Sequence, residues 1–458
     1  MTRLPPLRIP RCLLDPRAEL PAADAEGLVT VELEHRQGLI TAIRPAPATH
    51  QHPLLDGGEP WAAAPPGDPG EVFPTGAALA LTPLVDAHVH LDKAWTAAAF
   101  PNPEGTMAGA LAANLAEIAL RRPQEVHQRG ERALELAWRY GCRAMRSHVD
   151  SLGPSAEGGW EALIQLRDRW AGRLDLQLVA LAPLSHWATA EGEALARRVA
   201  TAGGLLGGVV GPPFERRSFD GAQISALLRL AERVGCGIDL HIDESDRQPA
   251  RGLRLLMALL ERRPCAVPIT CSHASSLALL PEPQLQRLAE RMARLGLSVV
   301  ALPLTNLWLL GRRPGCTPNS RPQAPLRQLQ AAGVAVAMAS DNVRDPWYPG
   351  GDFDPVELLR LSPLLSHLQP WRRLGLAPFS SGAARVLDLP WDGVLREGGP
   401  ADLLVLGCGG WGDLLARSPR RRVLRAGCWL PAPEAEHGDG MEHALAALSG
   451  CGEDPGGP

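Results

Sequence analysis

Short apolar runs alternate with longer amphipathic segments from about residue 80 to about residue 390 of the chain. Runs of this length are typical of strands, and eight of them are expected at residues 81–87, 143–148, 174–181, 205–210, 237–241, 267–272, 297–302 and 334–340. Apolar residues at helical spacing predict helices between several of them, at residues 123–140, 192–202, 222–234, 250–262 and 282–295. Strands that alternate with helices form a parallel sheet, and eight such units predict a closed (β/α)8 barrel of the TIM type.

Alternating apolar and polar residues also flank this region. Residues 28–33 and 38–43 predict a β-hairpin, and residues 402–406 and 423–427 predict two further strands. The simplest arrangement joins both ends of the chain in one small flanking β-domain, which we expect to be a β-sandwich.

This arrangement predicts the domain boundaries. We expect residues 1–79 and 391–430 to form the small β-domain, and residues 80–390 to form the barrel. Residues 46–75 are rich in Pro, Gly and Ala, so they predict a long loop. Residues 431–458, rich in Gly, Pro and Glu, predict a flexible tail.

The composition is that of an ordinary globular protein. The 458 residues are 45% hydrophobic and 21% charged, and this length suits a barrel with a smaller domain. A net charge of −4 does not favour binding to nucleic acid or to an acidic membrane, so we expect neither as a partner. The sequence leaves homo-oligomer formation open.

The cysteines and the first residues indicate a cytoplasmic protein. The nine cysteines contain no Cys-x-x-Cys pair, which favours reduced thiols over a disulfide framework. Residues 1–14 contain Pro and Arg where a signal peptide would have an apolar run, and no stretch approaches the length of a membrane span.

Histidines and carboxylates follow the ends of the predicted strands. His88 and His90 follow the first strand, and His148, His241 and His273 end later ones, so five of the 13 histidines lie at one rim. Active sites of such barrels lie at the carboxyl ends of the strands. A single strand-end histidine is more often a structural hydrogen-bonding group. Five of them, with an acid after the last strand, favour a functional site instead.

Three histidines and one carboxylate suit a divalent first-row metal ion and leave a position for water. A metal ion lowers the pKa of bound water, so hydroxide becomes available near neutral pH. Glu244 lies three residues beyond His241 and is the candidate proton shuttle. The alternative for Glu244 is an ion pair with one of the many arginines.

The chain contains a single lysine, Lys93, among its 46 lysine and arginine residues. Lysine is a compact charge on a flexible stem, whereas arginine is a rigid planar fork. In a chain that otherwise uses arginine, the one lysine is therefore a candidate for a chemical role that arginine cannot fill. Lys93 lies three residues beyond His90. The alternative is that one lysine has simply survived in an arginine-rich composition.

Six motifs in order resemble those of the amidohydrolase superfamily, and within it the cytosine deaminase group. The resemblance extends over about residues 80–430. The motifs lie at residues 83–92, 147–150, 241–244, 272–273, 303–306 with 311–312, and 341–349.

The resemblance implies one divalent metal ion, Fe2+ or Zn2+, held by His88, His90, His241 and Asp341. It also implies hydrolytic deamination of a cyclic amidine, in which activated water attacks the ring carbon that bears the amine. His148 is matched in the family, and we interpret it as structural support.

The resemblance also implies roles for further residues. Glu244 would deliver a proton to a ring nitrogen, and His273 would orient the attacking water and stabilise the tetrahedral intermediate. Asp341 would accept the proton of the water. Trp347 would form part of the pocket wall, where a flat indole suits a flat heterocycle; the alternative is that Trp347 is buried core.

Three positions depart from the cytosine deaminases. Leu184, after Pro183, stands in the place of a glutamine that reads the pyrimidine edge, and leucine forms no hydrogen bond. His186 is a possible substitute, although a surface histidine is the simpler interpretation. Asn342 replaces a second aspartate. Lys93 is more similar to the N-isopropylammelide isopropylamidohydrolases.

We therefore expect a metal-dependent deaminase that acts on a small nitrogen heterocycle other than cytosine. Lys93, Asn342 and Trp347 are the predicted substrate-binding residues. One alternative is a hydrolase of a cyclic amide or of an N-substituted triazine-like ring. Another alternative, from a different class, is a barrel that binds a metabolite without turnover.

Overall fold

The computed structural model describes residues 1–46, 77–212, 214 and 217–431. Eight parallel strands form a nearly closed barrel, in which each strand pairs with the next one along the chain. These strands are β6 (Leu84–Val89), β7 (Cys142–Asp150), β8 (Asp175–Leu181), β9 (Leu205–Val210), β10 (Ile238–Ile242), β11 (Ile269–His273), β12 (Ser298–Ala301) and β13 (Ala335–Met338). A bridge between Val89 and Asp341 links the first strand to the end of the last. The predicted (β/α)8 barrel is confirmed.

Close packing of the strands excludes large side chains at some positions. All residues of β10 and β11 are buried. A Cβ atom on Gly207 of β9 would lie 2.8 Å from a methyl group of Val179 and 2.9 Å from the carbonyl oxygen of Asp239. Glycine therefore allows β9 to lie between its two neighbours.

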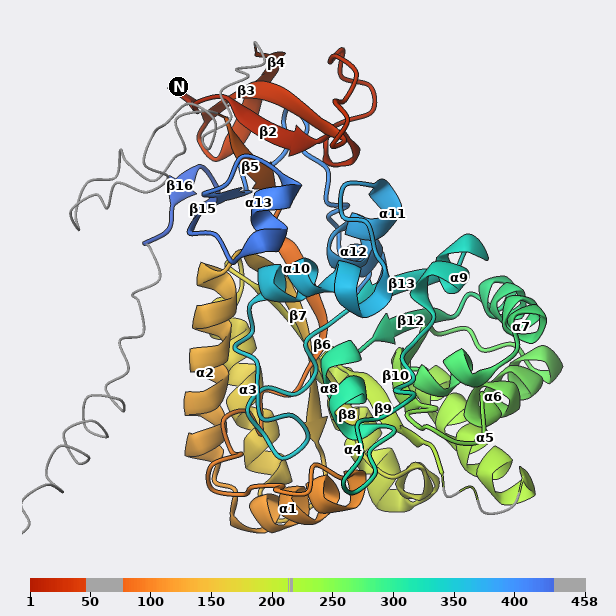
Figure 1. The fold of residues 1–458 in the computed structure, drawn as a ribbon. Helices are drawn as coiled ribbons and strands as arrows, with labels where there is room; N and C mark the ends of the chain where they lie inside the picture. Colours follow the sequence, from red (N-terminus) through yellow and green to blue (C-terminus); the bar gives the residue numbers. More distant parts are fainter. Residues whose placement is uncertain (47–76, 213, 215–216, 432–458) are drawn as a thin grey trace, which may run out of the picture.

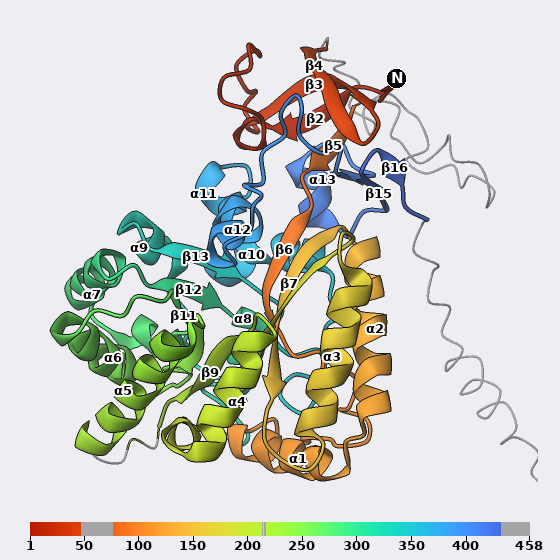
Figure 2. The ribbon, with the colours of Figure 1, turned by 180° about the vertical axis from the view of Figure 1, so that it is seen from behind.

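Six long helices flank the barrel on its outside (Figures 1 and 2). They are α2 (Pro123–Arg139), α3 (Ala156–Trp170), α4 (Ala190–Thr201), α5 (Arg217–Val234), α6 (Arg251–Arg262) and α7 (Glu282–Arg294). In α6 the buried residues recur every three to four positions, because one face of the helix packs on the barrel.

Further helices and turns complete the barrel region. The helices are α1 (Met107–Leu120), α8 (Pro303–Leu309), α9 (Leu326–Ala331), α10 (Pro355–Ser366), α11 (Arg373–Leu376) and α12 (Ser381–Val386). The single turns of 3-10 helix are η2 (Leu184–Ala188), η3 (Ser275–Leu279) and η4 (Ala377–Phe379). Of these elements α1 covers part of the site described below.

A second sheet of eight strands combines both ends of the described chain. Its order is β1-β3-β2-β5-β14-β15-β16, with β4 paired to β3. The strands are β1 (Thr2–Arg3), β2 (Leu7–Pro10), β3 (Leu28–Arg36), β4 (Leu39–Pro45), β5 (Ala78–Leu81), β14 (Leu403–Leu406), β15 (Arg421–Arg425) and β16 (Cys428–Trp429). The turn η1 (Arg11–Leu13) and the helix α13 (Trp411–Ala416) accompany this sheet. The domain boundaries themselves stay a prediction.

One predicted strand is wrong in its extent. The apolar run at residues 81–87 is divided between two sheets, because Leu81 ends β5 and the barrel strand β6 begins only at Leu84. Pro83 stands between them and has no N–H to continue a ladder. The other seven barrel strands end within two residues of their predicted bounds.

Two predictions lie almost entirely outside the described residues, namely the loop at residues 46–75 and the tail at residues 431–458. Among the helices of the described ranges, none combines the length and the apolar character needed to cross a membrane.

The two views show the small sheet at one end of the barrel and α1 at the opposite end (Figures 1 and 2). Because β5 of the small sheet leads directly into β6, the barrel strands begin near the small sheet. Their carboxyl ends therefore lie on the side of α1, where the polar side chains of the site gather.

Candidate active site

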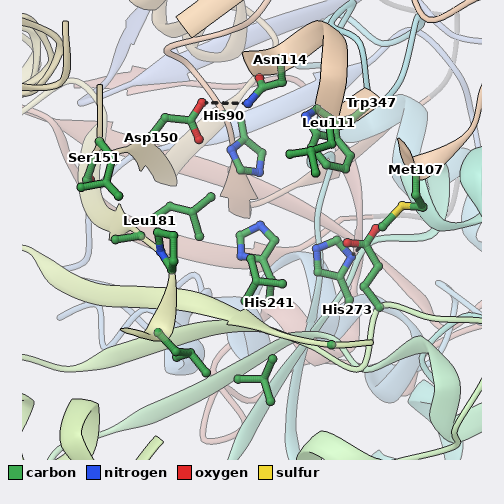
Figure 3. Close-up of a pocket in the computed structure, with 18 of the residues that line it drawn as sticks. His90, Met107, Leu111, Asn114, Asp150, Ser151, Leu181, His241, His273 and Trp347 are labelled. Carbon is green, nitrogen blue, oxygen red and sulfur yellow. Dashed lines mark hydrogen bonds and ion pairs between the residues drawn. The ribbon is translucent and has the colours of Figure 1, made fainter. Parts of the chain in front are cut away.

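Five histidines lie together at the carboxyl ends of the barrel strands. His88 and His90 come from β6 and the residue after it, His148 from β7, His241 from β10 and His273 from β11. All five are buried. The rings of His88 and His148 stack with centroids 3.8 Å apart, and those of His88 and His241 lie 4.8 Å apart. Figure 3 shows His90, His241 and His273 facing a common space.

Two overlapping groups of side chains can hold a metal ion. Ligand atoms of His88, His90 and His241 lie within 4.8 Å of one another, and so do those of His88, His273 and Asp341. One Asp341 carboxylate oxygen is 3.3 Å from Nε2 of His90 and 3.5 Å from Nε2 of His88. The structure thus brings together all four side chains that were predicted as ligands.

Several of these atoms have no hydrogen-bond partner within the described part of the chain, which is consistent with a metal site. Nε2 of His88 and both carboxylate oxygens of Asp341 are buried without a hydrogen bond from any described residue. Buried polar atoms are otherwise nearly always satisfied, so a cation among them is the simplest partner.

A third group, His88, His148 and Asp239, also has ligand atoms within 4.8 Å. Asp239, however, already accepts hydrogen bonds from Arg146 at 2.9 Å and from Ser272 at 2.6 Å. Its carboxylate is therefore less available to a metal ion than that of Asp341.

Burial keeps the cluster in the neutral form that binds metal. Burial, with the neighbouring histidines, lowers the pKa of His88 and of His241 well below the ordinary value. Burial and then the charge of Lys93 do the same for the pKa of His90. Neutral imidazole offers a lone pair to a cation, whereas imidazolium does not.

A chain of hydrogen bonds fixes the orientation of His88. The hydroxyl of Ser272 donates to Asp239 at 2.6 Å, and Nδ1 of His88 lies 2.9 Å from the same hydroxyl oxygen. Because the only hydroxyl proton goes to Asp239, the Ser272 oxygen accepts from Nδ1–H of His88. The lone pair of His88 is then on Nε2, which faces Asp341.

Glu244 is partly buried beside the cluster. Its carboxylate accepts a hydrogen bond from the Asn306 amide at 3.1 Å and lies 3.4 Å from Nδ1 of His273. Burial, and then the charge of Asp341, raises the pKa of Glu244 to about 8. These neighbours suit a proton shuttle better than the alternative of an arginine ion pair.

Asn306 also determines the tautomer of His273. Its amide N–H group lies 3.0 Å from Nδ1 of His273, so Nδ1 acts as the acceptor. The ring proton is then on Nε2, which has no hydrogen-bond partner among the described residues. Burial lowers the pKa of His273 to about 4, so the ring is neutral at pH 7.

Lys93 is buried against Asp150. Its ammonium group lies 3.1 Å from that carboxylate, which also accepts from Arg121 at 3.0 Å and from Asn114 at 3.3 Å. Burial opposes the charge of Lys93, but Asp150 and Asp92 outweigh it and raise the pKa of the lysine.

Asn342 and Trp347 belong to one turn held by Asp345. The side chain of Asn342 donates to Asp345 at 2.7 Å, and the backbone N–H of Trp347 donates to the same carboxylate at 2.8 Å. Trp347 is only partly buried, so it is not a residue of the hydrophobic core, which was the alternative interpretation.

A cavity of about 650 Å³ opens above the histidines. Its lining includes most of the predicted site residues: His90, Lys93, His241, Glu244, His273, Asp341, Asn342 and Trp347. Leu184 also lines it, whereas His186 does not belong to the lining that the described residues form.

Several residues of the site were not predicted from the sequence. Asn306 lies in a motif that carried the family resemblance, but its contacts with Glu244 and His273 have no sequence signal. The same is true of Ser272 and Asp239, which lie inside strands. The sequence pattern also did not predict α1, which supplies part of the cavity wall.

The chain is similar to several known proteins. The model of the amidohydrolase family matches residues 212–427. The chain is 35% identical to the pterin deaminase of Rhizobium rhizogenes over 404 residues, which is 87% of each chain. It is 26% identical to the N-isopropylammelide isopropyl amidohydrolase of a Pseudomonas species, over 70% of this chain and 78% of that one.

A solved structure extends the likeness to the whole fold. The 5-methylcytosine deaminase of Klebsiella pneumoniae, liganded with 5-fluorocytosine, superposes with a TM-score of 0.73 at 25% identity. The match covers 94% of this chain and 98% of that chain.

Proposed function

Because the chain belongs to the amidohydrolase family, we propose that it is a metal-dependent hydrolytic deaminase of a pterin-sized nitrogen heterocycle. Members of this family hydrolyse carbon–nitrogen bonds in cyclic compounds. The observation that carries the proposal is the joint placement of the histidine–aspartate cluster and Glu244 on one cavity.

The proposed cofactor is one divalent ion per chain, Fe2+ or Zn2+. His88, His90, His241 and Asp341 would hold it, since their ligand atoms converge. When bound, such an ion lowers the pKa of water and supplies a nucleophile near neutral pH.

Glu244 is the proposed proton donor to the ring nitrogen. In the metal-free protein its pKa is raised to about 8, which favours the protonated carboxylic acid at neutral pH. A protonated ring nitrogen accepts the electron pair as the water oxygen bonds to the amine-bearing carbon. Asp341 then passes the proton that it accepted from the water to the exocyclic amine, the bond to this amine breaks, and ammonia leaves. The carbon becomes a carbonyl as its hydroxyl proton returns to Glu244.

His273 and Asp341 are the proposed partners of the water. Asp341 accepts a proton from it, while Nε2–H of His273 donates to the oxygen that acquires charge in the tetrahedral intermediate. Asn306 holds His273 in this tautomer and holds Glu244 beside it.

Three observations favour a pterin-like substrate over a pyrimidine. The relative with 35% identity over 87% of this chain is a pterin deaminase. The cavity of about 650 Å³ is also larger than a single six-membered ring requires, and Leu184 offers no hydrogen bond to a pyrimidine edge.

A substrate panel tests the proposal. Purified protein loaded with Zn2+ or with Fe2+ is incubated with pterin, cytosine, isocytosine, creatinine and N-isopropylammelide, and ammonia and isopropylamine are measured separately. We expect ammonia from pterin. Ammonia from none of the four amines would contradict the proposal.

The second candidate is removal of an alkylamine from a triazine-like ring. It is favoured by the 26% identity with the N-isopropylammelide enzyme over 70% of this chain. Isopropylamine release without ammonia release would support it. Tight binding of a heterocycle by fully metal-loaded protein, without either product, would instead indicate a binding protein.

A further inference from the structure

Exposed apolar side chains gather at the mouth of the cavity. Among the large apolar side chains that stay exposed in the described ranges, four line this one cavity: Leu111, Leu115, Leu152 and Val209. Their exposed fractions are 49, 57, 38 and 54%. Single exposed apolar residues are common, but a group of them around a cavity marks a binding surface.

The helix α1 turns its apolar side toward the cavity. Met107, Leu111, Leu115 and Ile118 all line the cavity, together with Asn114. The four apolar residues follow one another at spacings of three or four, so they share one face of the helix. Figure 3 shows Met107 and Leu111 beside the histidines, on the side of Trp347.

Polar side chains hold α1 in this position. Asn114 donates to Asp150 at 3.3 Å, and Glu117 pairs with Arg121 and with Arg129. Asn114 and Glu117 are buried, while Leu111 and Leu115 are exposed. This is the reverse of an ordinary surface helix, whose exposed face is polar. The apolar face is therefore available to a ligand in the cavity.

The chemistry of the lining changes from the floor to the mouth. At the floor, the buried His241 and Asp341 and the partly buried Glu244 suit the polar edge of a heterocycle. At the mouth, Leu111, Leu115, Leu152 and Val209 form what we call the apolar shelf. A heterocycle bound at the floor directs any ring substituent on its far side toward this shelf.

We propose that the substrate carries an apolar substituent, an alkyl or aryl group, which lies on the apolar shelf. This inference rests on the proposed function and narrows its substrate class. Burial of apolar surface on both partners would favour such a substrate over the unsubstituted ring.

The test compares pterin with 6-phenylpterin and 7-phenylpterin, which present the same group from the two free ring carbons. Steady-state kcat/KM and, by fluorescence titration, Kd are measured with zinc-loaded protein. We expect one phenyl derivative to exceed pterin by about tenfold in kcat/KM and in affinity, the effect of a modest apolar contact in a pocket.

The matched variants lie on one helix. Leu111→Asn combined with Leu115→Asn should abolish most of that preference, measured as the ratio of kcat/KM for the preferred phenyl derivative to kcat/KM for pterin. The control is Leu120→Asn, because Leu120 is also exposed on α1 but does not line the cavity. The control should keep the full preference.

Three results would overturn the inference. One is that neither phenyl derivative exceeds pterin in affinity, and another is that the double variant keeps the preference. The third is that the double variant changes only the oligomeric state in light scattering, since the shelf would then be a contact between copies. If no pterin is hydrolysed, the proposed function fails, and the ratio of Kd values still decides the inference.

Discussion

The ammonium group of Lys93 lies 3.1 Å from the carboxylate of Asp150, and the side chains of both residues line the cavity. Arg121 contacts the same carboxylate at 3.0 Å, so Asp150 forms ion pairs with two cationic side chains. An ammonium group has three N–H donors, and the shared carboxylate leaves at least one for a substrate. The single lysine of the chain is thus a fixed, charged part of the cavity wall.

Lys93→Arg should lower turnover while the metal content stays normal. The planar guanidinium is wider than the ammonium group and cannot occupy the same buried space beside Asp150 without displacing it. We expect kcat/KM for the best substrate to fall about 10²-fold, the cost of a small misplacement in a site. Arg122→Lys is the control, because the Arg122 side chain is 73% exposed. Normal kinetics of Lys93→Arg would exclude a role in substrate binding.

Asp341→Asn should remove most of the bound metal. An amide oxygen is a weaker, uncharged ligand, so we expect the metal content to fall below about half an equivalent after purification. Elemental analysis measures it. His367→Asn is a control with one histidine fewer, because His367 is exposed at the end of α10, in a left-handed conformation that asparagine accepts. Full metal content in Asp341→Asn would exclude Asp341 as a ligand.

Ser272→Ala should weaken metal binding without removing a ligand. The variant leaves Nδ1 of His88 without its acceptor and leaves Asp239 without one donor, so His88 loses its fixed tautomer and orientation. Loss of such outer contacts typically costs about 10- to 100-fold in metal affinity. Competition with a chelator of known affinity measures the Kd for Zn2+. An unchanged Kd would mean that the hydrogen bond is only structural.

The sequence predicted most of the barrel because most residues of its strands are buried, so that the strands form apolar runs in the sequence. Residues 205–210 match β9 at both ends, since Gly203 and Gly204 come just before the run. Residues 81–87 do not, because Thr82 and Pro83 divide an equally apolar run between two sheets. Hydrophobicity alone cannot tell which sheet buries a residue.

The histidines could be predicted because they stand at strand ends, where the topology of the barrel brings them together. The Asp239–Ser272 contact could not, since it depends on which way two interior side chains point in paired strands. The helix α1 was missed for a related reason. Its apolar face lines a cavity instead of packing on the core, and its buried residues include the polar Asn114 and Glu117. The helix therefore lacks the amphipathic pattern that predicts a core helix.

Glu244→Gln should lose turnover and keep its metal. Glutamine preserves the size of the side chain but has no acidic proton, so we expect kcat to fall about 10²- to 10⁴-fold. Glu161→Gln, an exposed residue of α3, is the matched control. Wild-type activity in Glu244→Gln would assign the proton transfer to another group.

The pH dependence of kcat/KM of the wild-type enzyme should reflect the protonation of Glu244. Burial raises the pKa of Glu244 to about 8, so the acid form predominates at neutral pH and disappears as the pH rises through that value. If this acid protonates the ring, log kcat/KM should fall on the alkaline side, and a bound cation shifts the fall to lower pH because it stabilises the carboxylate.

Metal-free protein offers an independent measurement of this pKa. A carboxyl group whose folded pKa exceeds its unfolded value of 4.5 stabilises the fold in its protonated form. That contribution is complete below pH 4.5 and is lost as the pH rises toward about 8. The free energy of unfolding of the metal-free wild type should therefore fall between these values relative to Glu244→Gln, which cannot ionise. Urea unfolding measures this free energy at each pH for both proteins. If the two proteins show the same dependence on pH, the pKa of Glu244 is not raised, and the alkaline fall in activity must come from another proton donor.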